Sequence, residues 1–104
     1  AQPQRIVVEA LPATNVTVSL VGVEYVIPVP KITLGLIVAE RMQAAKDDPT
    51  ILMEELKSWV YATFGPEQGK KVWDRLFDPN DQLDIHHISD LLQKLTEVGA
   101  NPTT

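Results

Sequence analysis

The residue types best suited to chemistry in this chain lie between positions 78 and 87. Oxygen-bearing side chains that could bind a cation stand close together there: Asp78, Asn80, Asp81, Gln82 and Asp84. A calcium-binding EF-hand loop needs a glycine at its sixth position and a carboxylate at its twelfth. Counted from Asp78, these positions hold Leu83 and Ser89. The segment is therefore predicted to be a polar turn between two helices rather than a calcium site.

Two adjacent histidines, His86 and His87, follow this segment. On a helix, neighbouring side chains point about 100° apart, so these two cannot easily share one metal ion. The sequence also has no glycine-rich phosphate loop, no nucleophile elbow and no paired catalytic carboxylates. We therefore expect no catalytic residues, no metal site and no cofactor, and the chain is not expected to be an enzyme.

Composition narrows the possible partners. The 104 residues include nine Lys and Arg against fourteen Asp and Glu, which gives a net charge of −5. Nucleic-acid binding needs a cluster of basic side chains, and the basic residues here are scattered. No apolar run approaches the roughly 20 residues that span a bilayer. A soluble, intracellular, single-domain protein is expected, with neither nucleic acid nor membrane as partner.

The sequence patterns that are typical of β-strands lie in the N-terminal third of the chain. Positions 1–15 place two prolines around the short apolar run 6–8, and they are predicted to be either a loose arm or an edge strand. Apolar and polar residues then alternate over 16–28, which predicts a β-hairpin with Gly22 in its turn. Pro28 ends the pairing because it lacks a backbone N–H.

A lone hairpin is only marginally stable in water, so this one must pack on helices or pair with another strand. Its outer edge is therefore a candidate surface for self-association. The apolar residues assigned to that surface are Val16, Val18, Leu20, Tyr25 and Ile27. The alternative is that the N-terminal arm covers this edge.

Apolar residues at three- and four-residue spacing predict helices over about 34–46, 49–64, 66–77 and 85–98, followed by a tail at 100–104. Thr33 and Asp48 are the expected caps of the first and second helices. Gly65 and Pro66 are expected to separate the second from the third, and Gly99 to end the last. The predicted fold is mainly α within the α+β class. A single globular domain, 16–99, would contain the hairpin and a bundle of about four short helices.

The helix predicted over 49–64 has an apolar arc too wide for a helix with one buried side. Something must cover its second side, either the last helix or a partner protein. The residues predicted to bind a partner are Met53, Leu56, Trp59, Val60, Tyr61 and Phe64. The alternative is that these side chains belong to the core of the domain.

Several segments in a fixed order carry a resemblance to a known family. VTVSLVGVEYVIP forms the strand pair, TLGL at 33–36 opens a helix, and DDP at 47–49 interrupts the helices. FGPEQ at 64–68, WDRLFDPND at 73–81 and a leucine-rich last helix from Leu83 to Leu95 follow. Over about 16–98 the chain resembles the tail assembly chaperones of long-tailed, siphovirus-type phages that infect actinobacteria.

The resemblance implies a protein that acts in the host cytoplasm during infection and is absent from the mature virion. It would bind the long helical tape measure protein, keep it soluble and help recruit tail tube subunits. It also implies self-association into a homo-oligomer and a possible longer form made by ribosomal frameshifting. The alternative is a small structural virion protein, such as a head–tail joining protein, or a generic interaction adaptor.

Overall fold

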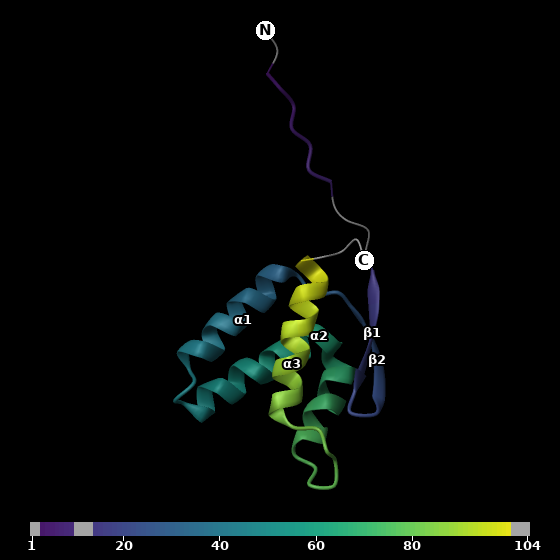
Figure 1. Ribbon diagram of the computed structural model, residues 1–104, viewed down its shortest axis with the longest axis vertical. Helices are drawn as coiled ribbons and strands as arrows, with labels where there is room; N and C mark the ends of the chain where they lie inside the picture. Colours follow the sequence, from purple (N-terminus) through teal and green to yellow (C-terminus); the bar gives the residue numbers. More distant parts are fainter. Residues whose placement is uncertain (1–2, 10–13, 101–104) are drawn as a thin grey trace.

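The computed structural model describes residues 3–9 and 14–100, with side chains described as far as Glu97. The hairpin comes first, with β1 at Asn15–Leu20 and β2 at Val23–Pro28. Three helices follow, which are α1 (Ile32–Ala44), α2 (Pro49–Leu76) and α3 (Ile85–Ala100). In Figure 1 the hairpin lies beside α2 at the right, α1 lies at the left, and α3 runs between them through the centre of the view. The expected mixed α+β class is confirmed, and the three helices are one fewer than the expected number of about four because α2 contains a kink that joins two helical parts.

The two strands pair antiparallel, from Asn15 opposite Pro28 to Leu20 opposite Val23. The turn between them contains only Val21 and Gly22, whose φ angles are 46° and 82°. A two-residue hairpin loop with positive φ at both positions is the type I′ turn, which matches the twist of paired strands. Glycine adopts this conformation freely, whereas a β-branched residue such as Val21 rarely does. The predicted hairpin is confirmed, including Gly22 in its turn.

α1 begins two residues earlier than its predicted cap would require. Lys31 precedes the helix in an extended conformation, and its carbonyl accepts hydrogen bonds from the N–H groups of Leu34 and Gly35. Thr33 therefore lies within the first turn and does not cap the helix. The prediction for Thr33 is wrong because the helix already starts at Ile32, with Lys31 as its N-cap residue and no capping hydrogen bond from that side chain.

α2 confirms two predicted boundaries, its start at Asp48 and the break at Gly65. Asp48 caps it, because its carboxylate accepts from the N–H groups of Thr50 and Ile51. Gly65, with a φ of 85° and a ψ of 168°, is non-helical, and Pro66 follows it. The predicted break at Gly65 and Pro66 is therefore confirmed: α2 consists of two helical parts that meet at a kink, and counting them as one element gives three helices instead of about four. A Cβ at Gly69 would lie 3.0 Å from the Tyr61 Cα, so the two parts of α2 cross closely at the kink.

The core lies between the inner face of the hairpin and the three helices. Its largest fully buried side chain is Trp59, which is 1% exposed. Trp73, half-buried, packs against the same cluster. The apolar stripe of α3 faces this core through Ile88, Leu92 and Leu95. The core thus joins every element of the fold.

The C-terminal end of the chain differs from its predicted assignment, whereas the N-terminal residues match one of their two predicted alternatives. α3 extends to Ala100, so Gly99 lies inside the helix instead of ending it. The rest of the predicted tail, 101–104, lies outside the described residues, as do 1–2 and 10–13. Residues 3–9 have no secondary structure and project away from the helices, as an arm would (Figure 1).

Candidate protein-binding surface

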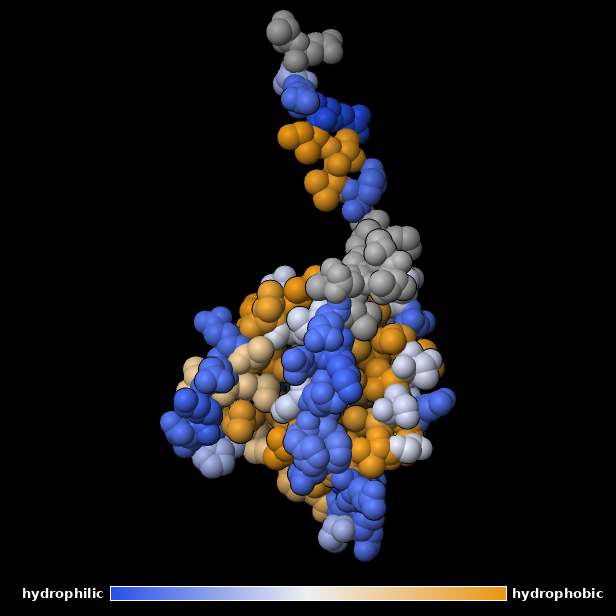
Figure 2. Space-filling view, viewed as in Figure 1, coloured by the Kyte–Doolittle hydropathy of each residue, from blue (hydrophilic) through white to orange (hydrophobic). Residues whose placement is uncertain are grey.

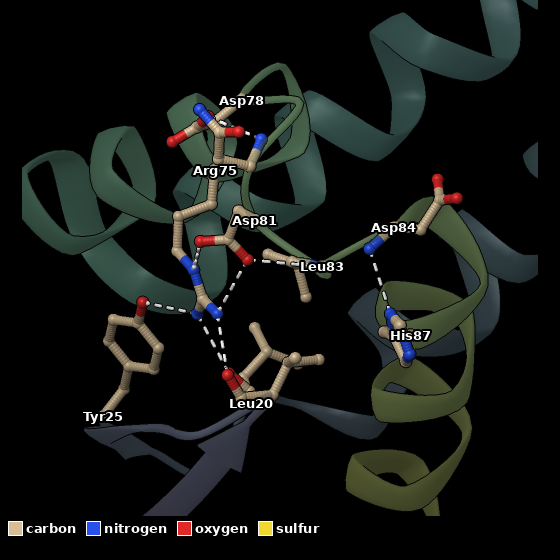
Figure 3. Close-up of polar contacts among 10 residues, drawn as sticks. Leu20, Tyr25, Arg75, Asp78, Asp81, Leu83, Asp84 and His87 are labelled. Atoms are coloured by element: carbon tan, nitrogen blue, oxygen red, sulfur yellow. Dashed lines mark hydrogen bonds and ion pairs between the residues drawn. The ribbon is translucent and has the colours of Figure 1, made fainter.

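The densest polar cluster centres on Arg75, near the end of α2 (Figure 3). Its Nε and one Nη donate to the Asp81 carboxylate at 2.7 and 3.1 Å. The remaining donors reach the Leu20 carbonyl, the Val21 carbonyl and the Tyr25 hydroxyl, at 2.9, 2.9 and 3.1 Å. All five guanidinium N–H groups therefore have acceptors. The cluster fastens the hairpin turn to the loop between α2 and α3.

The same contacts determine the charge state of Asp81. The hydrogen bond from Arg75, with a further one from the Leu83 N–H, holds the pKa of Asp81 below its usual range. Asp81 in turn raises the pKa of Arg75. The Arg75 and Asp81 side chains are only 14% and 22% exposed. Both therefore remain charged and paired at neutral pH, in a structural role.

The histidine pair stands at the beginning of α3. The backbone N–H of Asp84 donates to His87 Nδ1 at 2.9 Å, which is the role that a glutamate plays three residues after a helix cap (Figure 3). The two imidazole ring centroids lie 3.9 Å apart. Within the described part of the chain, no group of three or more His, Cys, Asp or Glu side chains could hold a metal ion. His87 thus has a structural contact that the sequence did not suggest.

An open cleft of about 630 Å³ lies between α1, the start of α2 and α3. Its apolar lining comes from all three helices: Gly35, Leu36, Ala39, Met42, Leu52 and Leu92. Its polar lining is Gln43, Lys46, Ser89, Gln93, Thr96 and Glu97. An apolar groove with a polar rim between helices is the kind of site that receives an amphipathic helix of a partner.

α1 adds exposed apolar surface beside this cleft. Leu36 and Ile37 are 58% and 41% exposed, whereas only Gly35 and Val38 in this helix are buried. Figure 2 shows apolar surface over α1, beside the hydrophilic outer face of α3. Helical spacing puts Leu34, Ile37, Val38 and Met42 on one face of α1, yet Ile37 stays exposed. The missed signal was that α1 carries more apolar residues than a single face can hold.

The residues predicted to bind a partner fall into two groups. Four of them are core residues and cannot contact a partner in this fold: Leu56, Trp59, Val60 and Phe64, at 0%, 1%, 0% and 4% exposure. The physical reason is that β2 and α1 pack against α2 and cover much of its wide apolar arc. Met53 and Tyr61 are half-buried and still reach the surface. Tyr61 also lines a shallow hollow, where the Lys57 ammonium lies 5.9 Å from its ring.

The residues predicted to mediate self-association face the core. Val18, Leu20, Tyr25 and Ile27 are buried, and Val16 is half-buried. The Tyr25 ring packs edge-on against Phe64 of α2, with centroids 5.4 Å apart. These side chains attach the hairpin to the helices, so only the backbone edge of the hairpin stays available to another strand.

Comparison with protein-family models, with curated proteins and with solved structures gives no match for this chain. Within residues 3–9 and 14–100, no helix combines the length and the apolar character that crossing a membrane requires. The surface feature of the described residues that is suited to binding another protein is the cleft beside the exposed apolar side of α1.

Proposed function

We propose that this protein is a non-enzymatic phage tail assembly chaperone. It binds and solubilises the helical tape measure protein and helps recruit tail tube subunits while the tail is built. It acts in the host cytoplasm and is left out of the mature virion. The proposal rests on the resemblance of the segments between 16 and 98 to this family. The helix of the partner is proposed to bind in the cleft between α1, the start of α2 and α3.

The observation that supports a helix-binding function is the apolar cleft of about 630 Å³ between α1 and α3. Leu36 lines this cleft while 58% exposed, so the monomer leaves an apolar side chain in water. Covering such a side chain is favourable, by about 25 cal/mol for each Å² removed from water. When a partner helix inserts one apolar face into the cleft, the burial of this apolar surface favours binding, and the polar face of the helix stays in solvent.

The character of the cleft also fits reversible binding. Its rim carries both signs of charge, Lys46 and Glu97, together with neutral amides such as Gln43 and Gln93. Such a rim tolerates different helix sequences because it does not impose one charge pattern. The net charge of −5 would keep complexes containing many copies of the chain soluble.

Two measurements on the same infection test the proposal. The tagged chain is used to capture partners from lysate of a phage-infected actinobacterial host, and purified virions are analysed by mass spectrometry. The proposal expects the tape measure protein in the captured fraction and the chain missing from virions. A fixed copy number of the chain in virions would support the head–tail joining alternative. A captured fraction without the tape measure protein would contradict the chaperone function.

A further inference from the structure

The hairpin has two outer backbone edges. The edge of β2 lies against α2, whereas the edge of β1 is open among the described residues. Thr14 and Val29 are joined by a hydrogen bond between their backbones, at 3.2 Å. Hydrogen-bonded pairs alternate along an antiparallel ladder, so Asn15, Thr17 and Ser19 direct their backbone N–H and C=O groups away from β2. In the described part of the chain, no hydrogen bond reaches these groups.

The outer edge of β2, in contrast, lies against α2. The Val26 carbonyl, which points outward by the same alternation, accepts a hydrogen bond from Gln68 of α2 at 3.3 Å. The outer edge of β1 is therefore the one that can receive a further strand. An open strand edge is a ready template for pairing with another extended segment.

The chain also carries an extended segment without a packing partner. In the arm, residues 3–9, the consecutive residues Ile6, Val7 and Val8 are 84%, 54% and 90% exposed. These residue types favour strands, and three exposed β-branched side chains in a row are costly in water. Figure 2 shows an apolar patch in the middle of the arm, between hydrophilic neighbours and away from the domain.

We propose that the arm of a second copy of this chain adds to the open edge of β1, and that the two copies exchange arms reciprocally. In an antiparallel register with Ile6 opposite Val18 and Val8 opposite Val16, both arm residues lie on the inner, apolar face of the sheet. Val7 then lies opposite Thr17 on the outer face. This register also makes the odd-numbered residues the hydrogen-bonded pairs, as the open groups of β1 require.

Charge favours the same register. Arg5 lies opposite Ser19, and Ser19 is paired with Glu24 of β2. Arg5 of one copy and Glu24 of the other therefore occupy one row on the outer face, two strands apart, with opposite charges. A long arginine side chain reaches that far across a sheet. Apolar pattern, hydrogen-bond alternation and charge agree on this single alignment.

A second copy is the occupant because residues 3–9 point away from their own domain, beyond the end of the hairpin (Figure 1). Two copies related by a two-fold axis each supply one arm and one edge, so every dimer contains two identical contacts. This inference concerns the hairpin edge and does not depend on what binds at the cleft between α1 and α3.

Sedimentation velocity of the full chain over a concentration series tests the proposal, with Ile6→Lys compared to Val7→Lys. Both substitutions add the same charge one residue apart in an exposed segment, so neither disturbs the core. The wild type is expected to dimerise. Ile6→Lys places its charge on the inner face and should raise the dimer dissociation constant at least about tenfold, whereas Val7→Lys changes it by less than about threefold.

Charge reversal tests the register itself. Arg5→Glu and Glu24→Arg should each weaken the dimer, and the double variant should recover most of the loss. A monomer at every concentration overturns the proposal, including the case in which the arm pairs with its own β1. A dimer that withstands Ile6→Lys equally overturns it, since the contact would then lie elsewhere.

Discussion

Arg75 is the side chain whose removal should damage this fold most directly. We predict that Arg75→Met lowers the free energy of unfolding by about 3 kcal/mol, in the range for breaking a buried charge pair. Methionine keeps the length of the apolar stem but removes all five hydrogen-bond donors. Asp81, the Leu20 and Val21 carbonyls and the Tyr25 hydroxyl would each lose a partner. The lower end of the range applies because the Arg75 and Asp81 side chains keep 14% and 22% exposure.

Urea denaturation followed by tryptophan fluorescence measures this loss, since Trp59 is buried and Trp73 half-buried. In a domain of this size, a loss of about 3 kcal/mol corresponds to a fall in Tm of roughly 15 °C. Lys70→Met is the matched control, because Lys70 forms an ion pair with Asp74 on the same helix but is 68% exposed. Exposed pairs of this kind contribute little, so the control should match the wild type within error. A loss below about 1 kcal/mol for Arg75→Met would show that the cluster does not stabilise the hairpin.

Two further predictions concern single side chains. Folding lowers the pKa of Asp81 below its unfolded-state value of about 4. The ionised Asp81 carboxylate therefore stabilises the folded state above about pH 4, and this stabilisation is lost as the pH falls through the lower folded-state pKa. Asp81→Asn should therefore have a lower free energy of unfolding in urea than the wild type at pH 7, and this difference should shrink below about pH 4. A difference in free energy that stays constant with pH would contradict the lowered pKa of Asp81. The Thr63 hydroxyl is buried without a hydrogen-bond partner among the described residues, so Thr63→Val should raise the free energy of unfolding by up to about 1 kcal/mol. Thr96→Val is the control and should be destabilising, because the Thr96 hydroxyl donates a hydrogen bond to the Leu92 carbonyl. If Thr63→Val is less stable than the wild type, the Thr63 hydroxyl does not destabilise the folded state.

Local sequence signals predicted the elements of this fold well. Alternation over 16–28 indicated the hairpin, and Asp48 before Pro49 indicated the start of α2, because both depend on neighbouring residues. Gly65 and Pro66 correctly marked the break between the two helical parts of α2. Whether a glycine and a proline produce a loop or a kink depends on how the flanking segments pack, here through the close approach at Gly69.

The proposed binding surface could be predicted only in part, because the exposure of a side chain depends on contacts between distant segments. The apolar residues of α2 suggested a binding face, but β2 and α1 bury most of them. The cleft needs Leu36 and Leu92 on the same side of the domain, which no local pattern specifies. Arg75 was missed for a similar reason, since its acceptors at Leu20 and Val21 lie more than fifty residues away in the chain.

The most direct test of the central claim is the affinity of three forms of the chain for a purified helical segment of the tape measure protein. Leu36→Lys places a charge in the cleft, and Ile37→Lys places the same charge on the next residue of α1, outside the cleft lining. Both side chains are exposed, at 58% and 41%, so both variants should fold normally. We predict that Leu36→Lys weakens binding at least about tenfold, while Ile37→Lys binds like the wild type. Equal binding by all three forms would show that the cleft is not where the partner's helix docks.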